Sequence, residues 1–341
     1  VTLDDVFRKA TDTHPLVAAL GLDLNGDGVL CRLDKMPHLL IAGATGAGKS
    51  SCLNSILVSL IRNNTPETLR LLLIDPKKVE LALYSGLPHL VCEIVTDAAR
   101  SVLALQWACE EMDRRYDRLA AAGVKTRDQY NAKHPNDPIP YLVVVVDELA
   151  DLMLVAGKDA EEAIVRLTQL ARAAGIHLVI ATQRPSVDVV TGLIKANMPS
   201  RLAFATASGK DSEVILDERG AEKLLGNGDG LYAPIGARAK IRIQGALVED
   251  ADVEKAVRAA AGNRTAERVT IEPPEKVDPL LERAIAVVMR AKSGSTSLLQ
   301  KEMRVGFPKA KELIDAMEKR GIVGPAVKGK ARAVLAEYEG A

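Results

Sequence analysis

The chain has 341 residues, of which 48% are hydrophobic and 26% charged, and its 45 basic residues balance its 45 acidic ones. This composition is typical of a globular protein and excludes a disordered, collagen-like or disulfide-stapled chain. No apolar run approaches the roughly 20 residues that cross a bilayer, and no signal segment opens the chain. We therefore expect about two domains that neither enter nor cross a membrane.

The four cysteines have no zinc-type or paired spacing, and several fall within apolar periodic segments. We expect reduced, buried thiols and a cytoplasmic location. Because the first residue is Val rather than Met, we also expect the chain to be a fragment of a longer protein.

Short apolar runs alternate with longer helical patterns over most of the chain. Strands that are apolar on both faces and separated by helices predict an α/β fold with a mainly parallel sheet. A long helix is expected from Asp97, a candidate N-cap, to Ala122. After the glycine-rich segment 226–230, a hairpin at 231–234 and 240–243 is expected to close the sheet. The expected parallel strands are 39–42, 71–74, 142–146, 178–181 and 201–205.

The last part of the chain has a different character. Residues 262–278 show no helical or strand period, which predicts a linker between a domain at 1–261 and a domain at 279–341. From residue 263 on, 15 Lys and Arg stand against 11 Asp and Glu. Helices expected near 280–292, 297–303 and 308–320, with a hairpin-like end, predict a helix-turn-helix with a wing.

Residues 43–50 match the phosphate-binding pattern G-x-x-x-x-G-K-[ST] in full, between an expected strand and an expected helix. The glycines allow backbone N–H groups to curl around phosphate oxygens at a helix N-terminus. Lys49 would reach the β- and γ-phosphates and the Ser50 hydroxyl would bind Mg²⁺, so the expected ligands are ATP and Mg²⁺. The alternative is a structural glycine-rich turn. The expected nucleotide-binding residues here are Gly43, Ala44, Thr45, Gly46, Ala47, Gly48, Lys49, Ser50 and Ser51.

Polar residues at the ends of further expected strands complete this hypothesis. Asp147 follows a buried strand and could hold the Mg²⁺ shell, while Glu148 could polarise an attacking water. The alternative is that both acids cap the next helix. Gln183 ends another strand and could reach the γ-phosphate or the water, or be a turn residue before proline. The role of segment 75–78 (DPKK) stays open between a solvated turn and a nucleotide or DNA contact.

The order of these segments resembles the motor region of the FtsK/SpoIIIE family of bacterial double-stranded DNA translocases. The resemblance extends over about 1–261 and resumes at 279–335. It implies a RecA-like ATPase core that forms a hexameric ring around duplex DNA, with each ATP site between neighbours, in chromosome segregation and cell division. The stretches that match are 35–43 (KMPHLLIAG), 73–77 (LIDPK), 144–148 (VVVDE), 171–177 (ARAAGIH), 181–189 (ATQRPSVDV) and 192–197 (GLIKAN).

The resemblance also implies residue roles and partners. Arg172 corresponds to an arginine finger that reaches the neighbour's γ-phosphate, with Arg201 in reserve; a helix C-terminal Arg that interacts with the helix dipole is the alternative. Arg184 and Lys195 correspond to pore-loop contacts to DNA phosphates, and Lys210 is one place removed from a third. Further implied partners are a site-specific recombinase and division proteins, with a membrane anchor in the full-length protein only.

The tail is similar to the family's winged-helix domain, but its recognition helix departs from the usual pattern. Where family members show Asn-Arg-Ala-Ala-Arg, this chain has Pro308 to Glu312, and Pro and Glu cannot make the bidentate contacts of Asn and Arg to base edges. We expect DNA binding without the usual sequence preference. The expected phosphate contacts are Lys309, Lys311, Lys328, Lys330 and Arg332.

Three functions remain in competition at this point. The leading one is an ATP-driven pump for duplex DNA. The first alternative is a DNA-segregation scaffold in which the nucleotide controls ring assembly only. The other, a coupling or secretion ATPase that moves protein, is disfavoured by the expected winged helix.

Overall fold

The computed structural model describes residues 1–262, 268–271, 279–319, 321–325 and 331–335. The chain forms two compact units, Val1–Ile271 and Glu272–Ala341. Residues 268–271, which fall within the expected linker, pack on the first unit, where Val269 N donates to Val91 O at 2.7 Å and Ile271 is buried. No helix in the described ranges is long and apolar enough to cross a membrane.

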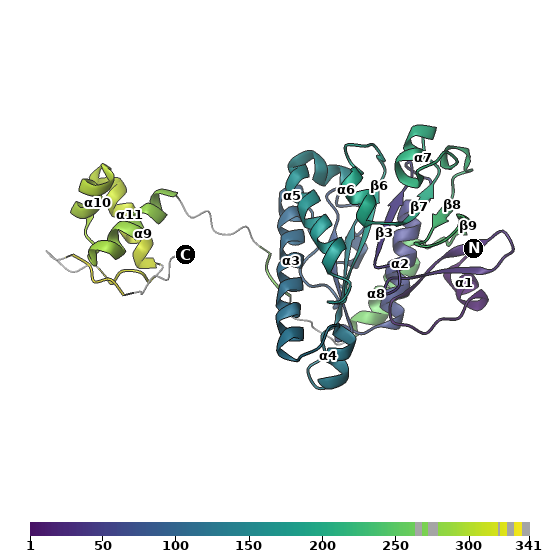
Figure 1. The fold of residues 1–341 in the computed structure, drawn as a ribbon, viewed down its shortest axis with the longest axis horizontal. Helices are drawn as coiled ribbons and strands as arrows, with labels where there is room; N and C mark the ends of the chain where they lie inside the picture. The colour runs from purple at the N-terminus through teal and green to yellow at the C-terminus, as the bar shows by residue number, and fades with distance from the viewer. Residues whose placement is uncertain (263–267, 272–278, 320, 326–330, 336–341) are drawn as a thin grey trace. The chain divides into compact units, whose positions relative to one another are not determined.

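The first unit is built on one nine-stranded sheet with the order β2-β1-β9-β8-β7-β3-β6-β5-β4 (Figure 1). Strands β7, β3, β6, β5 and β4 are parallel neighbours, and the remaining pairs are antiparallel. The α/β fold and the parallel block are therefore confirmed. The strands are β1 (Val17–Asp23), β2 (Gly28–Arg32), β3 (His38–Ala42), β4 (Leu69–Ile74), β5 (Tyr141–Val146), β6 (Ile176–Thr182), β7 (Ser200–Phe204), β8 (Asp229–Ala233) and β9 (Ile241–Gly245).

Helices cover both faces of this sheet (Figure 1). The expected long helix is α3, whose N-cap Asp97 accepts a hydrogen bond from Arg100 N and which ends just before Gly123 in the left-handed region. The helices of this unit are α1 (Leu3–Lys9), α2 (Lys49–Asn63), α3 (Ala98–Ala121), α4 (Arg127–Lys133), α5 (Leu149–Leu170), α6 (Gly192–Asn197), α7 (Gly209–Leu216) and α8 (Asp250–Ala261), with the 3-10 turns η1 (Ala82–Tyr84) and η2 (Ala221–Lys223).

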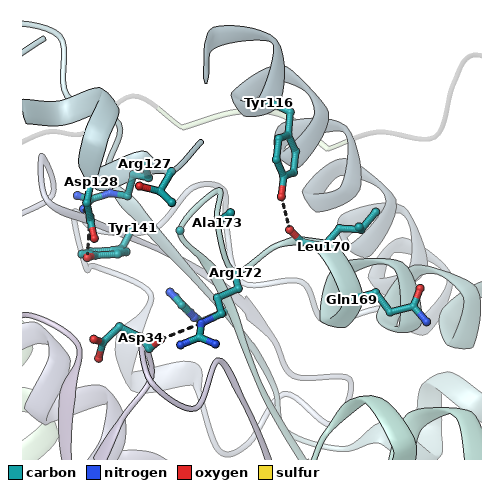
Figure 2. A pocket seen from close by; sticks show the side chains of 12 residues that line it. Asp34, Tyr116, Arg127, Asp128, Tyr141, Gln169, Leu170, Arg172 and Ala173 are labelled. Carbon is teal, nitrogen blue, oxygen red and sulfur yellow. Dashed lines mark hydrogen bonds and ion pairs between the residues drawn. The ribbon is translucent and has the colours of Figure 1, made fainter. Parts of the chain in front are cut away.

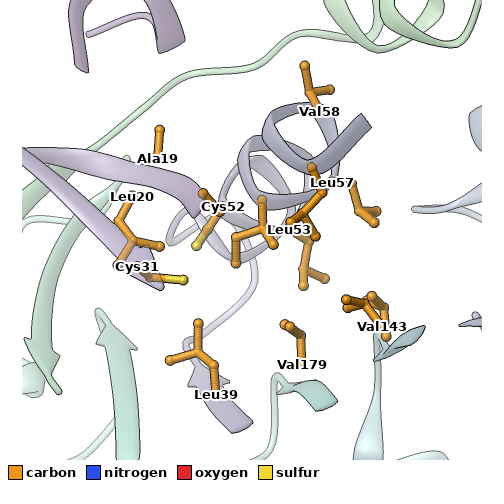
Figure 3. Packing of buried hydrophobic residues seen from close by; sticks show 14 of the residues in the cluster. Ala19, Leu20, Cys31, Leu39, Cys52, Leu53, Leu57, Val58, Val143 and Val179 are labelled. Carbon is orange, nitrogen blue, oxygen red and sulfur yellow. The ribbon is translucent and has the colours of Figure 1, made fainter. Parts of the chain in front are cut away.

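Alternate residues of the central strands contribute side chains to two separate hydrophobic cores, one on each face of the sheet. In β3, Leu39 and Ile41 join the cluster beneath α2 and α8, whereas Leu40 and Ala42 join the cluster beneath α3 and α5. Figure 3 shows the first cluster, in which Leu39 and Val179 face Leu53 of α2. Because successive side chains of a strand point to opposite faces, a central strand buried on both faces is apolar throughout.

The hairpin of β8 and β9 is confirmed, but the expectation that it closes the sheet is wrong. Strand β9 pairs with β1, which pairs with β2 in turn, and neither of these two strands was expected. The approach of β1 to β9 requires glycine, since a Cβ at Gly21 would lie 2.2 Å from the carbonyl oxygen of Gln244. The sheet therefore extends by two strands drawn from the first 32 residues.

The second unit holds the three expected helices, α9 (Pro279–Ala291), α10 (Thr296–Met303) and α11 (Phe307–Lys319). Helix α10 is N-capped by Ser295, whose hydroxyl accepts from Leu298 N. Isolated bridges join Gly294 to Arg332 and Val323 to Val334. The unit has its own core, formed by Leu281, Ala284, Ile285, Val288, Leu299, Ala310, Leu313, Ile314, Met317 and Val323.

Candidate nucleotide site

The phosphate-binding loop lies between the carboxyl end of β3 and the start of α2. Its backbone is tied to both neighbouring strands, because Gly43 N donates to Thr182 O at 3.3 Å and Ala44 N to Ala205 O at 2.8 Å. Gly48 has φ +124°, and a Cβ there would lie 2.7 Å from Gly228 Cα. Only glycine meets both requirements, so this loop is built to expose backbone N–H groups at a helix N-terminus.

Lys49 and Asp147 form a buried pair at the base of this loop. The Lys49 ammonium donates to the backbone oxygen of Asp147 at 2.9 Å and forms an ion pair with its carboxylate. Burial raises the pKa of Asp147, and the charge of Lys49 opposes this shift. Oxygen Oδ2 of Asp147 is buried without a hydrogen-bond partner among the described residues. A free carboxylate oxygen and the Ser50 hydroxyl are both of the kind of oxygen ligand that Mg²⁺ takes.

Glu148 follows Asp147 and is held from several directions. Its Oε1 accepts from the Thr182 hydroxyl at 2.7 Å, and both carboxylate oxygens lie 3.2 Å from Gln183 N. Its Oε2 forms an ion pair with Lys77 Nζ, also at 3.2 Å. Although Glu148 also caps α5, the Oε1 contact to Ala150 N is the longest of these, at 3.4 Å. The carboxylate is thus oriented mainly by β6 and by the loop after β4.

Gln183 brings the end of β6 to the phosphate-binding loop. The Thr45 hydroxyl donates to its amide oxygen at 3.1 Å. Both the loop and Gln183 line a cavity of about 450 Å³. The same cavity is lined by residues that sequence reasoning missed, namely Val1, Asn227, Gly228, Gln244, Gly245, Ala246 and Leu247. The sequence predicts the glycine-rich run 226–230 only as the segment that precedes a hairpin, although glycines are also common where two backbones approach closely.

Arg172 lies at the opposite edge of the sheet. It follows α5 and precedes β6, is exposed, and donates from Nε to Asp34 O at 3.2 Å (Figure 2). Arg172 lines a cavity of about 430 Å³ together with Tyr141 and Arg127. Figure 2 shows these side chains. Strand β6, roughly 20 Å long at about 3.3 Å per residue, separates Arg172 from Gln183. Arg172 is therefore too far away to reach a nucleotide bound to its own chain.

The reserve candidate, Arg201, is bound within its own unit. Its guanidinium forms an ion pair with Asp217 and donates to backbone oxygens of Lys195, Met198 and Ile215. Asp217 also pairs with Lys195 Nζ at 2.7 Å. The Asp217 carboxylate at the end of α7 therefore binds both Arg201, the second candidate for the arginine finger, and Lys195, an expected DNA contact.

The other expected DNA contacts differ in how free they are. Arg184 and Lys210 of the first unit are exposed. Lys311, on α11 of the second unit, is also exposed. Lys309 pairs with Glu312 at 2.9 Å, and Arg332, with 12% of its side chain exposed, pairs with Asp315 and Glu318. The charge of Arg332 is therefore engaged within its own unit. Lys328 and Lys330 lie outside the described residues.

All four cysteines and the histidines His38, His89 and His177 are buried. The cysteines are free, and burial raises the pKa of Cys92 to about 11. Buried His38 is the first residue of β3 and buried His177 the second residue of β6. Desolvation lowers the pKa of His38 to about 3 and that of His177 to about 4. Within the ranges that the structure describes, no three His, Cys, Asp or Glu side chains gather as a metal cluster.

Comparison with protein families gives two matches, the FtsK/SpoIIIE family over residues 4–187 and the Ftsk gamma domain over residues 275–337. The chain belongs to the FtsK/SpoIIIE family. It is 51% identical to the DNA translocase FtsK of Streptomyces avermitilis, over 99% of this chain and 41% of that protein. It is also 51% identical to the DNA translocase FtsK of Mycobacterium tuberculosis H37Rv, over 98% of this chain and 44% of that protein. The chain thus spans less than half the length of these relatives.

Solved structures of similar fold agree with this family placement. The conjugation coupling protein TcpA of pCW3, in its monomer form with ATPγS, gives a TM-score of 0.65 at 27% identity, over 73% of this chain and 71% of that one. The cytoplasmic domain of the type VII secretion ATPase EccC from Thermomonospora curvata gives a TM-score of 0.69 at 25% identity, over 80% of this chain and 36% of that one. The FtsK/SpoIIIE member described here therefore shares its core with ATPases.

Proposed function

We propose that this chain is the ATP-hydrolysing part of a motor that moves double-stranded DNA during chromosome segregation and cell division. The relatives that match almost the whole chain are named DNA translocases. The observation that carries the proposal is the convergence of Lys49, Asp147, Glu148 and Gln183 beside a complete phosphate-binding loop. A site that only stored nucleotide would not need an oriented carboxylate next to the position of the phosphates.

Each residue of this site has a distinct role in the proposed hydrolysis. The backbone of Gly43 to Ser51 cradles the phosphates, and Lys49 leaves Asp147 to contact the β- and γ-phosphates of ATP. Ser50 and Asp147 would hold Mg²⁺, which would supply positive charge near the phosphates. Glu148 orients and deprotonates the attacking water, and Gln183 contacts the γ-phosphate or that water.

The arginine that completes the site comes from a neighbouring copy in a ring, which we propose to be hexameric. Arg172 supports this assignment because it is exposed and lies a full strand length from its own phosphate-binding loop. Arg201 supports it less well, since its guanidinium is bonded to Asp217 and to three backbone oxygens. A guanidinium at the junction would neutralise charge that develops on the γ-phosphate.

We further propose that Arg184, Lys195 and Lys210 contact DNA phosphates, because a motor that slides should bind the backbone rather than the bases. Lys195 must leave Asp217 to do so. A site-specific recombinase and division proteins are proposed partners. We place the chain in the cytoplasm, with any membrane anchor elsewhere in the full-length protein.

Residues 279–341 are proposed to be a winged-helix DNA-binding domain, with 262–278 as linker and 1–261 as motor. Exposed Lys311 supplies a point charge, and Pro308 and Glu312 offer no bidentate base contact. A competition between G-rich octamer duplexes and scrambled controls should give a preference below about 100-fold, or about 2.7 kcal/mol. A larger preference would show that other residues read the sequence.

The direct test is ATPase activity of the purified chain with and without linear duplex DNA. Stimulation by duplex DNA supports the pump, and Glu148→Gln must abolish it while ATP binding persists. A scaffold in which nucleotide controls assembly only would form rings with ATP yet show no turnover above that of Glu148→Gln. Stimulation by protein substrates instead of duplex DNA would support a secretion-type ATPase.

A further inference from the structure

The hydroxyl of Thr182 lies between two residues that have separate proposed roles. It donates to Glu148 Oε1 at 2.7 Å and accepts from Arg184 N at 3.0 Å. Thr182 is completely buried at the end of β6, whereas Arg184, two residues later, is exposed. A single buried group therefore connects the backbone of a proposed DNA contact with the proposed general base.

The direction of these two bonds follows from the chemistry of the groups. A peptide N–H can only donate and an ionised carboxylate can only accept, so the hydroxyl must accept from Arg184 and donate to Glu148. Bonds in such a chain polarise one another, and the bond to the carboxylate is charge-assisted. A shift of the Arg184 backbone thus changes both the geometry and the strength of the bond to Glu148.

Glu148 also has contacts to Lys77 and to the backbone of Gln183. Lys77 reaches Oε2 from the loop after β4, with 41% of its side chain exposed. Gln183 contacts both carboxylate oxygens at 3.2 Å through its backbone N, in the residue that precedes Arg184, while its side-chain amide oxygen accepts from the Thr45 hydroxyl of the phosphate-binding loop. Of the described side chains bonded to Glu148, Thr182 is the one that also bonds the Arg184 backbone.

We propose that Thr182 is a positioning residue that transmits DNA contact at Arg184 to the orientation of the Glu148 carboxylate. This inference rests on the proposed function, because it assigns a route by which duplex DNA stimulates hydrolysis. When phosphates bind the Arg184 side chain, its backbone moves, and the Thr182 hydroxyl turns the carboxylate toward the attacking water.

Three substitutions distinguish positioning by the Thr182 hydroxyl from a role in which Thr182 only packs at the end of β6. Thr182→Val keeps the volume and removes both hydrogen bonds, while Thr182→Ser keeps the hydroxyl in a smaller side chain. Thr182→Cys replaces the hydroxyl by a weak donor of similar size and provides a second test if the valine variant does not fold. A residue that only packs would tolerate valine better than serine.

The experiment measures kcat and KM for ATP, with and without a linear duplex of mixed sequence, together with duplex affinity by fluorescence anisotropy. We expect the stimulation ratio to fall about tenfold or more in Thr182→Val and to fall in Thr182→Cys, to stay within about twofold in Thr182→Ser, and duplex affinity to be retained. A parental ratio in Thr182→Val, or in Thr182→Cys if valine does not fold, would overturn the inference, as would an equal loss in Thr182→Ser. If the parent chain itself shows no stimulation, the proposed function fails, and this inference fails with it.

Discussion

The two edges of the same parallel strands are built in opposite ways. At the carboxyl edge four side chains are buried and bonded in two pairs, Lys49 to Asp147 and Thr182 to Glu148. At the amino edge, Arg172 is exposed and bonded to a single backbone oxygen of the turn after β2. A group that is already oriented, such as Glu148, costs no rearrangement when the reaction occurs, whereas a group that serves another molecule must stay accessible. The difference indicates which half of the site a chain provides for itself.

Among substitutions at the two edges, Arg172→Ala should have the largest effect on ATP turnover. Loss of an arginine finger is expected to lower ATP turnover by about 10³-fold or more, with nucleotide affinity little changed. The matched control is Arg166→Ala, which removes an exposed arginine of α5 that pairs with Asp113. Steady-state ATPase assays and ADP titrations measure both quantities.

Rings assembled from two variant chains test whether Arg172 acts on the site of a neighbouring subunit. Rings that contain both Arg172→Ala and Glu148→Gln chains should regain turnover at junctions where an intact Arg172 faces an intact Glu148. No recovery in rings shown to contain both chains would contradict action between subunits.

At the carboxyl edge, substitutions of Glu148 and of Lys49 should have different effects. Glu148→Gln is expected to keep ATP bound and to lower turnover about 10²-fold to 10⁴-fold, because only the base is lost. Lys49→Ala should lose nucleotide binding, since it removes the cation that contacts phosphate. Equilibrium binding of a fluorescent ATP analogue measures the contrast, with exposed Lys158→Ala as the control. Parental affinity in Lys49→Ala would refute the phosphate-loop assignment.

The amino edge should be the acid-sensitive one, because buried His38 and His177 remain neutral there. Their folded pKa values, about 3 and about 4, lie below the unfolded value near 6.5, so between these limits the unfolded chain binds more protons. The free energy of unfolding should fall by about 2 kcal/mol between pH 7 and pH 5.5. Urea denaturation at both pH values measures this, and His177→Gln should remove about half of the change. A pH-independent free energy of unfolding would contradict the assignment.

The smallest expected effect concerns Lys77, which restrains Glu148 from the loop after β4. Lys77→Met should lower kcat about tenfold with little change in KM for ATP, because the ammonium orients the base without contacting nucleotide. Lys77→Arg should restore most of the activity, and neighbouring Lys78→Met serves as the control. An equal loss in Lys78→Met would show that the loop, not the ion pair, is responsible.

The parts of the site that could be predicted are those encoded locally. The phosphate-binding loop is one continuous motif, and Asp147 and Gln183 follow apolar strands whose carboxyl ends share an edge. Lys77 could not be assigned, because its contact depends on β4 lying beside β5 with Ile74 opposite Val146. Strands β1 and β2 were missed for a related reason: β1 pairs with β9, more than 200 residues later. The pairing of Arg201 with Asp217 likewise depends on where α7 ends.

The contact between Gly48 and Gly228 has a consequence for how the chain folds during its synthesis. Gly228 N donates to Ala47 O at 2.9 Å, and the Ser51 hydroxyl donates to Ala246 O at 3.0 Å. Translation adds residues one by one, so a nascent chain that has emerged from the ribosome only as far as residue 220 presents a phosphate-binding loop without this support. The nascent chain therefore acquires its complete nucleotide site only once β9 has emerged and paired with β1.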